Sequence, residues 1–369
     1  MNPRLSAARP RRLAAAVVMA LAVGSLAAAA QAHTKGGAAS SGNDYRRTNL
    51  VSDQPGRARI TDPNLVNAWG LSALPTSPIW VADNGTDVST LYAGAVHGSP
   101  PAIVPLVVSI PGGAPTGTVA NSGKGFVIGH GSSAAPALFL FASEAGRITA
   151  WNPGPGPSPS THAVTVARVS GAIYKGLALA RAEHGAHIYA ANFHDARIDV
   201  WDSKFRRVWR HRFRDPNIPA GFAPFNIQRV DGWLLVSYAK QDEDAEDDVP
   251  GPGNGFVDAF TPNGHLVKRL ISHGVLNSPW GLVRAPQGFG RFSGDLLVGN
   301  FGNGTIHAFN LGSGKLLGTL MTHGHPISID GLWALRFGNG TFGDAHTLIF
   351  SAGPDDESHG LLGSIRAVR

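Results

Sequence analysis

The chain has 369 residues, of which 15% are charged, 43% are hydrophobic and 47 are glycine. Soluble domains usually carry roughly 25% charged residues and about 7% glycine, so charge is scarce here and turn formers are abundant. With 26 prolines and no cysteine, the composition excludes a disordered polyelectrolyte, a coiled coil and a disulfide scaffold. It favours many short strands joined by tight turns.

The first 32 residues have the pattern of a secretory signal peptide. Four arginines precede an apolar stretch, residues 13–30, which ends in an A-x-A site. Without them the chain has 27 basic and 25 acidic residues, a net charge of about +2. We therefore expect a secreted or periplasmic protein, cleaved after Ala32, with no nucleic-acid partner. Arg11-Arg12 leaves the general secretory and twin-arginine export routes both open.

The mature chain is expected to begin with a flexible leader, residues 33–44. No other segment has eighteen or more consecutive apolar residues, so we expect no membrane span.

The remaining sequence repeats itself. Trp69-Gly70-Leu71 recurs as Trp280-Gly281-Leu282, and looser versions stand at 175–177 and 331–333. Each anchor is followed by an apolar strand ending in Asn or Asp, a turn with glycine, and a further strand. Six such copies, each of roughly fifty residues, predict an all-β protein: a six-bladed β-propeller over residues 45–369, with four antiparallel strands per blade.

The sixth copy lacks a fourth strand, whereas the segment Tyr45–Ser52 is strand-like and has no blade of its own. We expect this N-terminal strand to complete the last blade and close the ring, because closure removes an open sheet edge. A second edge prediction concerns residues 204–214, KFRRVWRHRFR, which we interpret as the outermost strand of the third blade.

Antiparallel blades place the turn between the second and third strands on the same face as the linker into the next blade. We expect a polar rim there, around the mouth of the central channel, which suits a hydroxylated ligand or a hard cation. The alternative is that Asn and Asp serve only as turn residues. The candidate ligand-binding residues are Asn67, Trp69, Asp83, Asn84, Asn192, His194, Asn226, Asn277, Trp280, Asn300, Asp330 and Asp355.

His194 is the candidate catalytic base or ligand, because it lies in a rim turn beside Asp195. The remaining histidines match no zinc-binding spacing.

An acidic run, residues 242–248, lies within the fourth repeat. It is not an EF-hand, because the sixth position from Asp242 is Asp247, where that loop requires glycine. Three interpretations stay open: a solvated loop, a lid over a ligand, and a loop stabilised by calcium or another divalent cation. The metal ligands would then be Asp242, Asp244, Asp247 and Asp248.

With these features in view, the chain resembles an uncharacterised family of exported bacterial six-bladed β-propeller proteins whose members often carry a C-terminal sorting tail. The resemblance implies the propeller fold and export, and no established activity. We expect no such tail in this chain, so anchoring by it is not implied. The resemblance is carried by residues 45–53, 67–71, 115–117, 191–194, 198–200, 238–242, 253–258 and 278–282.

Two functional classes remain open at this stage. The first is a binding or interaction module that recognises a carbohydrate, a metal or a protein partner at the rim, acting as a monomer. The second is a metal-dependent hydrolase of the lactonase type, in which a cation in the central channel polarises a carbonyl oxygen. A propeller fold alone does not choose between them.

Overall fold

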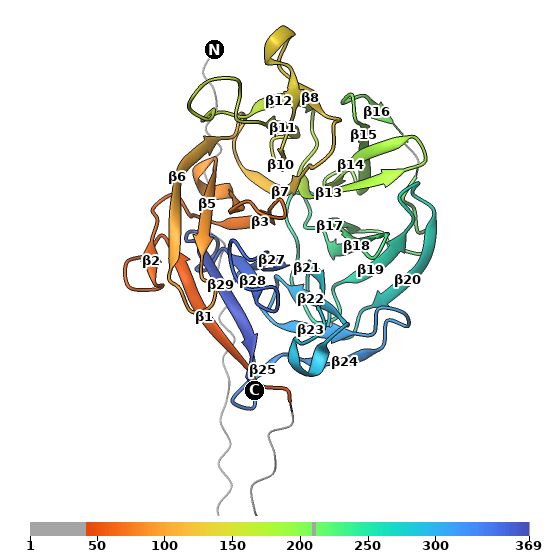
Figure 1. Cartoon of the computed structure of the whole chain (residues 1–369). Helices are drawn as coiled ribbons and strands as arrows, with labels where there is room; N and C mark the ends of the chain where they lie inside the picture. The colour runs from red at the N-terminus through yellow and green to blue at the C-terminus, as the bar shows by residue number, and fades with distance from the viewer. Residues whose placement is uncertain (1–41, 209–211, 369) are drawn as a thin grey trace, which may run out of the picture. The chain divides into compact units, whose positions relative to one another are not determined.

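The computed structural model describes residues 42–208 and 212–368. The predicted signal peptide, residues 1–32, and most of the predicted leader lie outside them. The described chain forms six β-sheets arranged as blades around a central axis, which confirms the predicted propeller (Figure 1). In Figure 1 the blades follow one another clockwise, beginning with β3–β6 at the left. Within the described ranges, no helix has the length and hydropathy needed to cross a membrane.

The first three blades have four antiparallel strands each, ordered from the channel outwards. Blade one contains β3 (Ala68–Ser72), β4 (Ile79–Asp83), β5 (Val88–Gly94) and β6 (Pro101–Ser109). Blade two contains β7 (Pro115–Ala120), β10 (Phe139–Ser143), β11 (Arg147–Trp151) and β12 (Val164–Arg168). Blade three contains β13 (Tyr174–Ala182), β14 (Gly185–Asn192), β15 (Arg197–Asp202) and β16 (Arg207–Val208).

The other three blades repeat this plan. Blade four contains β17 (Phe222–Val230), β18 (Trp233–Lys240), β19 (Phe256–Phe260) and β20 (Leu266–Ser272). Blade five contains β21 (Pro279–Arg284), β22 (Leu296–Asn300), β23 (Ile306–Phe309) and β24 (Leu316–Thr319). Blade six contains β27 (Leu332–Phe337), β28 (Leu348–Ala352), β29 (Leu361–Ala367) and β1 (Tyr45–Ser52).

Smaller elements decorate the blades. Two short hairpins are β8 (Val127–Ile128) with β9 (Ala135–Pro136) and β25 (Met321–Thr322) with β26 (His325–Pro326). The 3-10 helices are η1 (Asn84–Thr86), η2 (Gly131–Ser133) and η3 (Gly290–Phe292). The outer strand expected over residues 204–214 is reduced to β16, and residues 209–211 lie outside the described chain.

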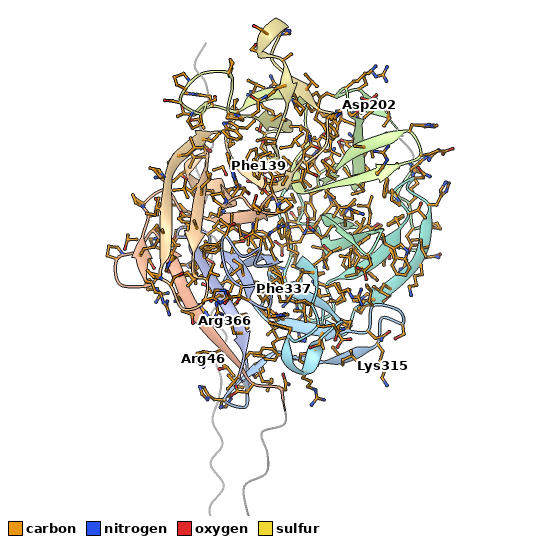
Figure 2. All side chains as sticks on the ribbon, in the orientation of Figure 1. Arg46, Phe139, Asp202, Lys315, Phe337 and Arg366 are labelled. Carbon is orange, nitrogen blue, oxygen red and sulfur yellow. The ribbon has the colours of Figure 1, made fainter. Side chains whose placement is uncertain are left out.

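The ring is closed as predicted. β1 pairs antiparallel with β29, from Tyr45 opposite Ala367 to Ser52 opposite Leu361. Tyr45 is fully buried, and its hydroxyl donates a hydrogen bond of 3.1 Å to the carbonyl of Phe289. β2 (Ile60–Thr61) adds a parallel fifth strand outside β1, which the repeat pattern did not indicate. Figure 2 shows Arg46 and Arg366 along this seam, far from Lys315 on another blade.

In every blade the pairing between the innermost strand and the second strand slips once. A β-bulge of this kind redirects a side chain, and here it turns one residue per blade into the channel. The channel-facing bulge residues are Trp69, Thr116, Lys175, Phe225, Trp280 and Trp333.

The glycine after the bulge explains part of the repeated motif. A Cβ at Gly117 would lie 2.3 Å from the backbone nitrogen of Leu177 in the next blade, and one at Gly176 would lie 2.2 Å from the Asn226 amide oxygen. Neighbouring innermost strands therefore approach too closely for a side chain at these two positions.

We call the end of the channel that carries the second-to-third-strand turns the upper end. The turns contact the linkers there: the backbone nitrogen of Asn84 donates to the carbonyl of Asn67 at 3.0 Å, and that of Phe193 donates to the carbonyl of Ile173 at 2.8 Å. Turns and linkers thus share one face of the ring.

Candidate functional site

Aromatic side chains fill the centre of the ring just below the upper mouth. Trp333 stacks between Trp69 and Phe301, at ring-centroid distances of 3.5 and 4.0 Å. Trp280 meets Trp69 edge-on at 6.1 Å, and Phe225 lies 5.8 Å from Trp333. We call these five residues the aromatic plug.

The plug corrects one prediction about the rim. Trp69 and Trp280 are only 1% and 4% exposed, so their indole rings pack inside the channel and offer no face to a ligand at the rim. Both tryptophans lie near the upper end of the channel, as the sequence pattern indicated. The bulges, however, turn their side chains towards the centre of the channel, where they pack against each other.

Lys175 takes the channel-facing bulge position of blade three, where other blades carry an aromatic residue or threonine. Its side chain is 2% exposed, and its ammonium lies 5.3 Å from the ring centre of Trp69. Nζ donates to Oε1 of Glu144 at 2.5 Å and to Oδ1 of Asp247 at 3.0 Å. Burial alone would lower the pKa of Lys175, but the two carboxylates raise it, so the ammonium stays charged.

Glu357 approaches the same point from the turn between β28 and β29. Its Oε2 accepts a hydrogen bond of 2.8 Å from Nδ2 of Asn67. Burial raises the pKa of Glu357 to about 7; Lys175 opposes that rise, whereas Glu144 and Asp247 add to it. This carboxyl therefore titrates near neutral pH.

The turn that carries Glu357 has an uncommon backbone. Asp355, Asp356 and Glu357 all lie in the left-handed region, with φ values of 57°, 53° and 65°. Aspartate tolerates this conformation, whereas a left-handed glutamate costs roughly 1–2 kcal/mol. Strain of this kind collects at functional sites, where the surrounding structure holds it in place.

Two asparagines connect the carboxylates to the plug. Asn67 donates from Nδ2 to Oδ1 of Asn84 at 3.2 Å, and Asn84 donates from Nδ2 to Oε2 of Glu144 at 2.9 Å. Nε1 of Trp333 donates to Oδ1 of Asn67 at 3.1 Å. We define the mouth cluster as Asn67, Asn84, Glu144, Lys175, Asp247 and Glu357.

Three predicted rim residues are instead buried at the ends of second strands. Asp83 accepts from the backbone nitrogen of Thr90 at 2.9 Å, and burial raises its pKa well above the usual value. Asn192 donates to Asp199 at 3.0 Å, and Asn300 donates to the carbonyl of Val275 at 2.8 Å. Asp83 and Asn192 thus bond across their own turns, whereas Asn300 bonds to the linker before β21.

Other predicted residues lie apart from the mouth cluster. Asn277 accepts from the backbone nitrogen of Gly251 at 2.7 Å, and Asp330 accepts from that of Asp355 at 2.9 Å. His194 and Asp355 are exposed.

Asn226 was expected in a linker, but it lies inside β17. The bulge at Phe225 precedes it, so its side chain is buried and donates to the carbonyl of Trp280 at 2.7 Å. This placement corrects the prediction.

The acidic run folds into a loop that closes on itself. The backbone nitrogen of Asp242 donates to the carbonyl of Asp247 at 2.9 Å, and Oδ1 of Asp242 accepts from the nitrogen of Glu246 at 2.9 Å. The Asp247 carboxylate contacts Lys175. Within the described ranges, no group of three or more His, Cys, Asp or Glu side chains is arranged to hold a metal ion. Calcium binding by this loop stays a prediction.

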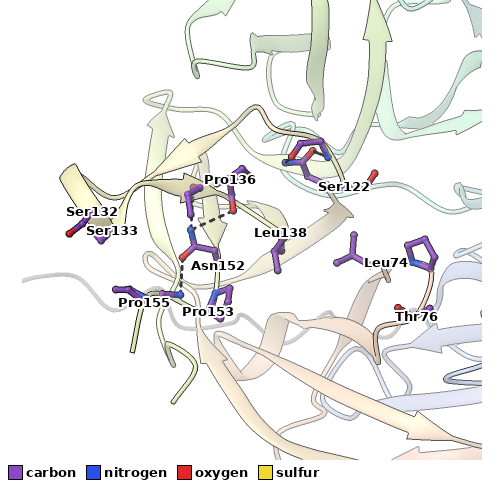
Figure 3. A pocket seen from close by; sticks show the side chains of 15 residues that line it. Leu74, Thr76, Ser122, Ser132, Ser133, Pro136, Leu138, Asn152, Pro153 and Pro155 are labelled. Atoms are coloured by element: carbon purple, nitrogen blue, oxygen red, sulfur yellow. Dashed lines mark hydrogen bonds between the residues drawn. The ribbon is translucent and has the colours of Figure 1, made fainter. Parts of the chain in front are cut away.

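A separate cavity of about 580 Å³ lies at the opposite, lower end of the ring, between blades one and two (Figure 3). Its walls include Leu74, Leu138 and Pro153, and Asn152 is held there by a bond of 3.0 Å to the backbone of Gly154. No charged side chain lines it. It offers apolar surface and no acid–base chemistry.

These features define a six-bladed β-propeller with a plugged channel and a charged mouth. The chain belongs to the same family as two uncharacterised proteins of Acanthamoeba polyphaga mimivirus. R648 is 34% identical over 327 residues, covering 86% of this chain and 78% of R648. L690 is 33% identical over 332 residues, covering 86% of this chain and 84% of L690. No known protein-family profile matches the chain.

Among solved structures, a protein of unknown function from Bacteroides thetaiotaomicron has a TM-score of 0.52 and 9% identity, covering 88% of this chain and 77% of that one. At this identity the likeness concerns the fold alone. Export of this chain stays a prediction.

Sequence reasoning missed three members of the mouth cluster as site residues: Glu144, Lys175 and Glu357. The available signal for Lys175 was its position in the repeat. Lys175-Gly176-Leu177 aligns with Trp69-Gly70-Leu71, so a lysine stands where the repeat places a channel-filling tryptophan.

Proposed function

We propose that this protein is a binding module whose mouth cluster recognises a small hydroxylated ligand, such as a carbohydrate or polyol. The observation that carries this proposal is the convergence of Glu144, Asp247 and Glu357, from blades two, four and six, around the ammonium of Lys175. The three acids come from three separate blades, and the stability of a single blade does not require them to converge.

The chemistry of the cluster favours hydroxyl groups over phosphate. Carboxylate oxygens accept hydrogen bonds from hydroxyls, and asparagine both donates and accepts. The side chains of Glu144 and Asp247 are 28% and 61% exposed, so a ligand can reach them. Glu144 and Asp247, together with the partly ionised Glu357, outweigh the single ammonium, and this net negative charge disfavours a phosphate.

The test is a calorimetric screen of neutral mono- and oligosaccharides and polyols, followed by variants. Glu144→Gln and Asp247→Asn each remove a charge-assisted hydrogen bond, worth about 1.5–3 kcal/mol, and should weaken binding by roughly tenfold or more. Lys315→Ala, at the lower end of blade five, is the control and should leave affinity unchanged. A sugar that binds equally well to both variants and the parent contradicts the proposal.

A hydrolase is the second candidate, and Glu357 is the observation that favours it. A carboxyl with a pKa of about 7 is suited to take or give a proton at neutral pH. If the protein hydrolyses lactones or esters with Glu357 as base, the rate should rise as pH increases through about 7 and be lost in Glu357→Gln. A panel of lactones and esters tests this, and turnover retained in Glu357→Gln refutes that role.

A further inference from the structure

Below the aromatic plug the channel opens into a cavity that reaches the lower face. Its upper part, of about 230 Å³, is lined by the innermost strands of all six blades. Its lower part, of about 370 Å³, forms the lower mouth. The two parts share Leu71, Thr118, Gln228 and Arg336, so we treat them as one space, the lower channel.

Three arginines line the lower mouth: Arg181 near the end of β13, Arg229 on β17 and Arg336 on β27. No aspartate or glutamate lines either part of the lower channel. Within the described residues, none of these three arginines forms an ion pair with a carboxylate.

The lack of a carboxylate partner is most destabilising for Arg336. It is half-buried, its Nη2 donates to the carbonyl of Ala73 at 3.2 Å, and burial lowers its pKa. A partly desolvated cation without a counter-charge destabilises the folded state. By contrast, Arg284 stands at the same end of the neighbouring β21 and pairs with Asp231. The chain thus neutralises Arg284, which lies outside the lower channel, and leaves the channel arginines uncompensated.

Polar and apolar groups share the walls above the arginines, where Thr118, Asn226 and Gln228 lie among apolar side chains. Leu71, Leu177, Leu282 and Phe337 line the upper part together with Trp280. The Nε1 of Trp280 is buried and has no hydrogen-bond partner within the described residues. Figure 2 shows Phe337 near the middle of the ring. The lower channel therefore combines a cationic mouth with an interior in which leucine, phenylalanine and tryptophan side chains alternate with polar groups.

We infer that the lower channel binds a small organic anion with a partly apolar body, whose carboxylate or phosphate group is held by Arg181, Arg229 and Arg336. Guanidinium groups bind both anions through paired hydrogen bonds. The apolar part of the body covers Leu71, Leu177 and Leu282, and the plug closes the far end. This site has the opposite charge to the mouth cluster and does not depend on the function proposed for it.

Four probes test the inference by isothermal titration: octanoate, octyl phosphate, octanol and inorganic phosphate. Octanoate, octyl phosphate or both should bind saturably, and affinity should fall as salt concentration rises. Whichever of the two binds more tightly identifies the head group. Octanol binding as tightly as octanoate overturns the inference, as does inorganic phosphate binding as tightly as octyl phosphate. Absence of saturable binding by both amphipathic anions also overturns it.

Variants locate the site. The double variant Arg181→Gln/Arg229→Gln changes two exposed side chains, so it should fold, and it should weaken anion binding about tenfold or more. Arg336→Gln should weaken it further; if this variant fails to fold, the double variant decides. Arg284→Gln is the matched control, because it removes a positive charge from the same face outside the lower channel. Equal weakening by Arg284→Gln, or none by the double variant, refutes the assignment.

Discussion

Replacing Glu357 with glutamine should make the protein more stable at neutral and alkaline pH. The carboxyl has a pKa of about 7 in the folded protein, against 4.5 for an ordinary glutamate. Between these values the folded state therefore binds more protons than the unfolded state, and stability falls as pH rises through this window. Glutamine resembles the protonated acid, can still accept from Asn67 and cannot ionise.

The expected size follows from the shift. Each pKa unit corresponds to about 1.4 kcal/mol, so a difference between 4.5 and about 7 amounts to at most about 3.5 kcal/mol. The stability gain of Glu357→Gln over the parent should be near zero at pH 4 and should reach its full value at about pH 8. Other groups that titrate in this range contribute equally to both proteins, so they cancel in the difference.

Urea unfolding at a series of pH values, followed by tryptophan fluorescence, measures this difference. Asp356→Asn is the control, because it removes the same charge from the neighbouring, exposed position of the same turn. A difference between Glu357→Gln and the parent that is constant across pH, or that shrinks as pH rises, would refute the reasoning about Glu357.

Three further predictions concern closure, the buried lysine and the acidic loop. Tyr45→Ala should destabilise the protein by about 3–5 kcal/mol in urea unfolding, and deletion of residues 45–52 should cause aggregation; a deletion variant that melts within a degree or two of the parent contradicts the closure. Lys175→Met leaves its carboxylate partners facing one another, so its cost in the same assay should fall at the lower end of roughly 3–5 kcal/mol, and an unchanged midpoint contradicts the described ion pairs. A quadruple variant carries asparagine in place of Asp242, Asp244, Asp247 and Asp248. If the acidic loop binds calcium, added calcium should raise the melting temperature of the parent and leave that of the quadruple variant unchanged. No shift in either protein means a solvated loop.

The fold was predictable because its signals are local and repeated. Alternating apolar residues and the recurrence of Trp-Gly-Leu specify strands and their spacing, and the missing sixth outer strand directed attention to Tyr45–Ser52. The parallel strand β2 was not predictable, because two residues carry no periodicity.

For the candidate site, the sequence predicted only which face of the propeller carries it. Which side chains meet there depends on register shifts in strands far apart in sequence. Asn226, for example, lies inside β17 directly after the register shift at Phe225. Likewise, three successive left-handed residues bring Glu357, and not Asp355, to Asn67. Such backbone conformations follow from the assembled ring, and single-residue preferences do not reveal them.

The seam that closes the ring also has a mechanical direction. Tyr45 and Ala367 are partners, so the chain enters β1 and leaves β29 at the same end of the ladder. Tension applied through the segments outside these two residues would break the hydrogen-bonded pairs one after another, beginning at Tyr45. The pairs would not share the force at the same time. A propeller tethered at both ends would therefore open at this seam under low force, whereas pulling through loops of other blades would meet greater resistance.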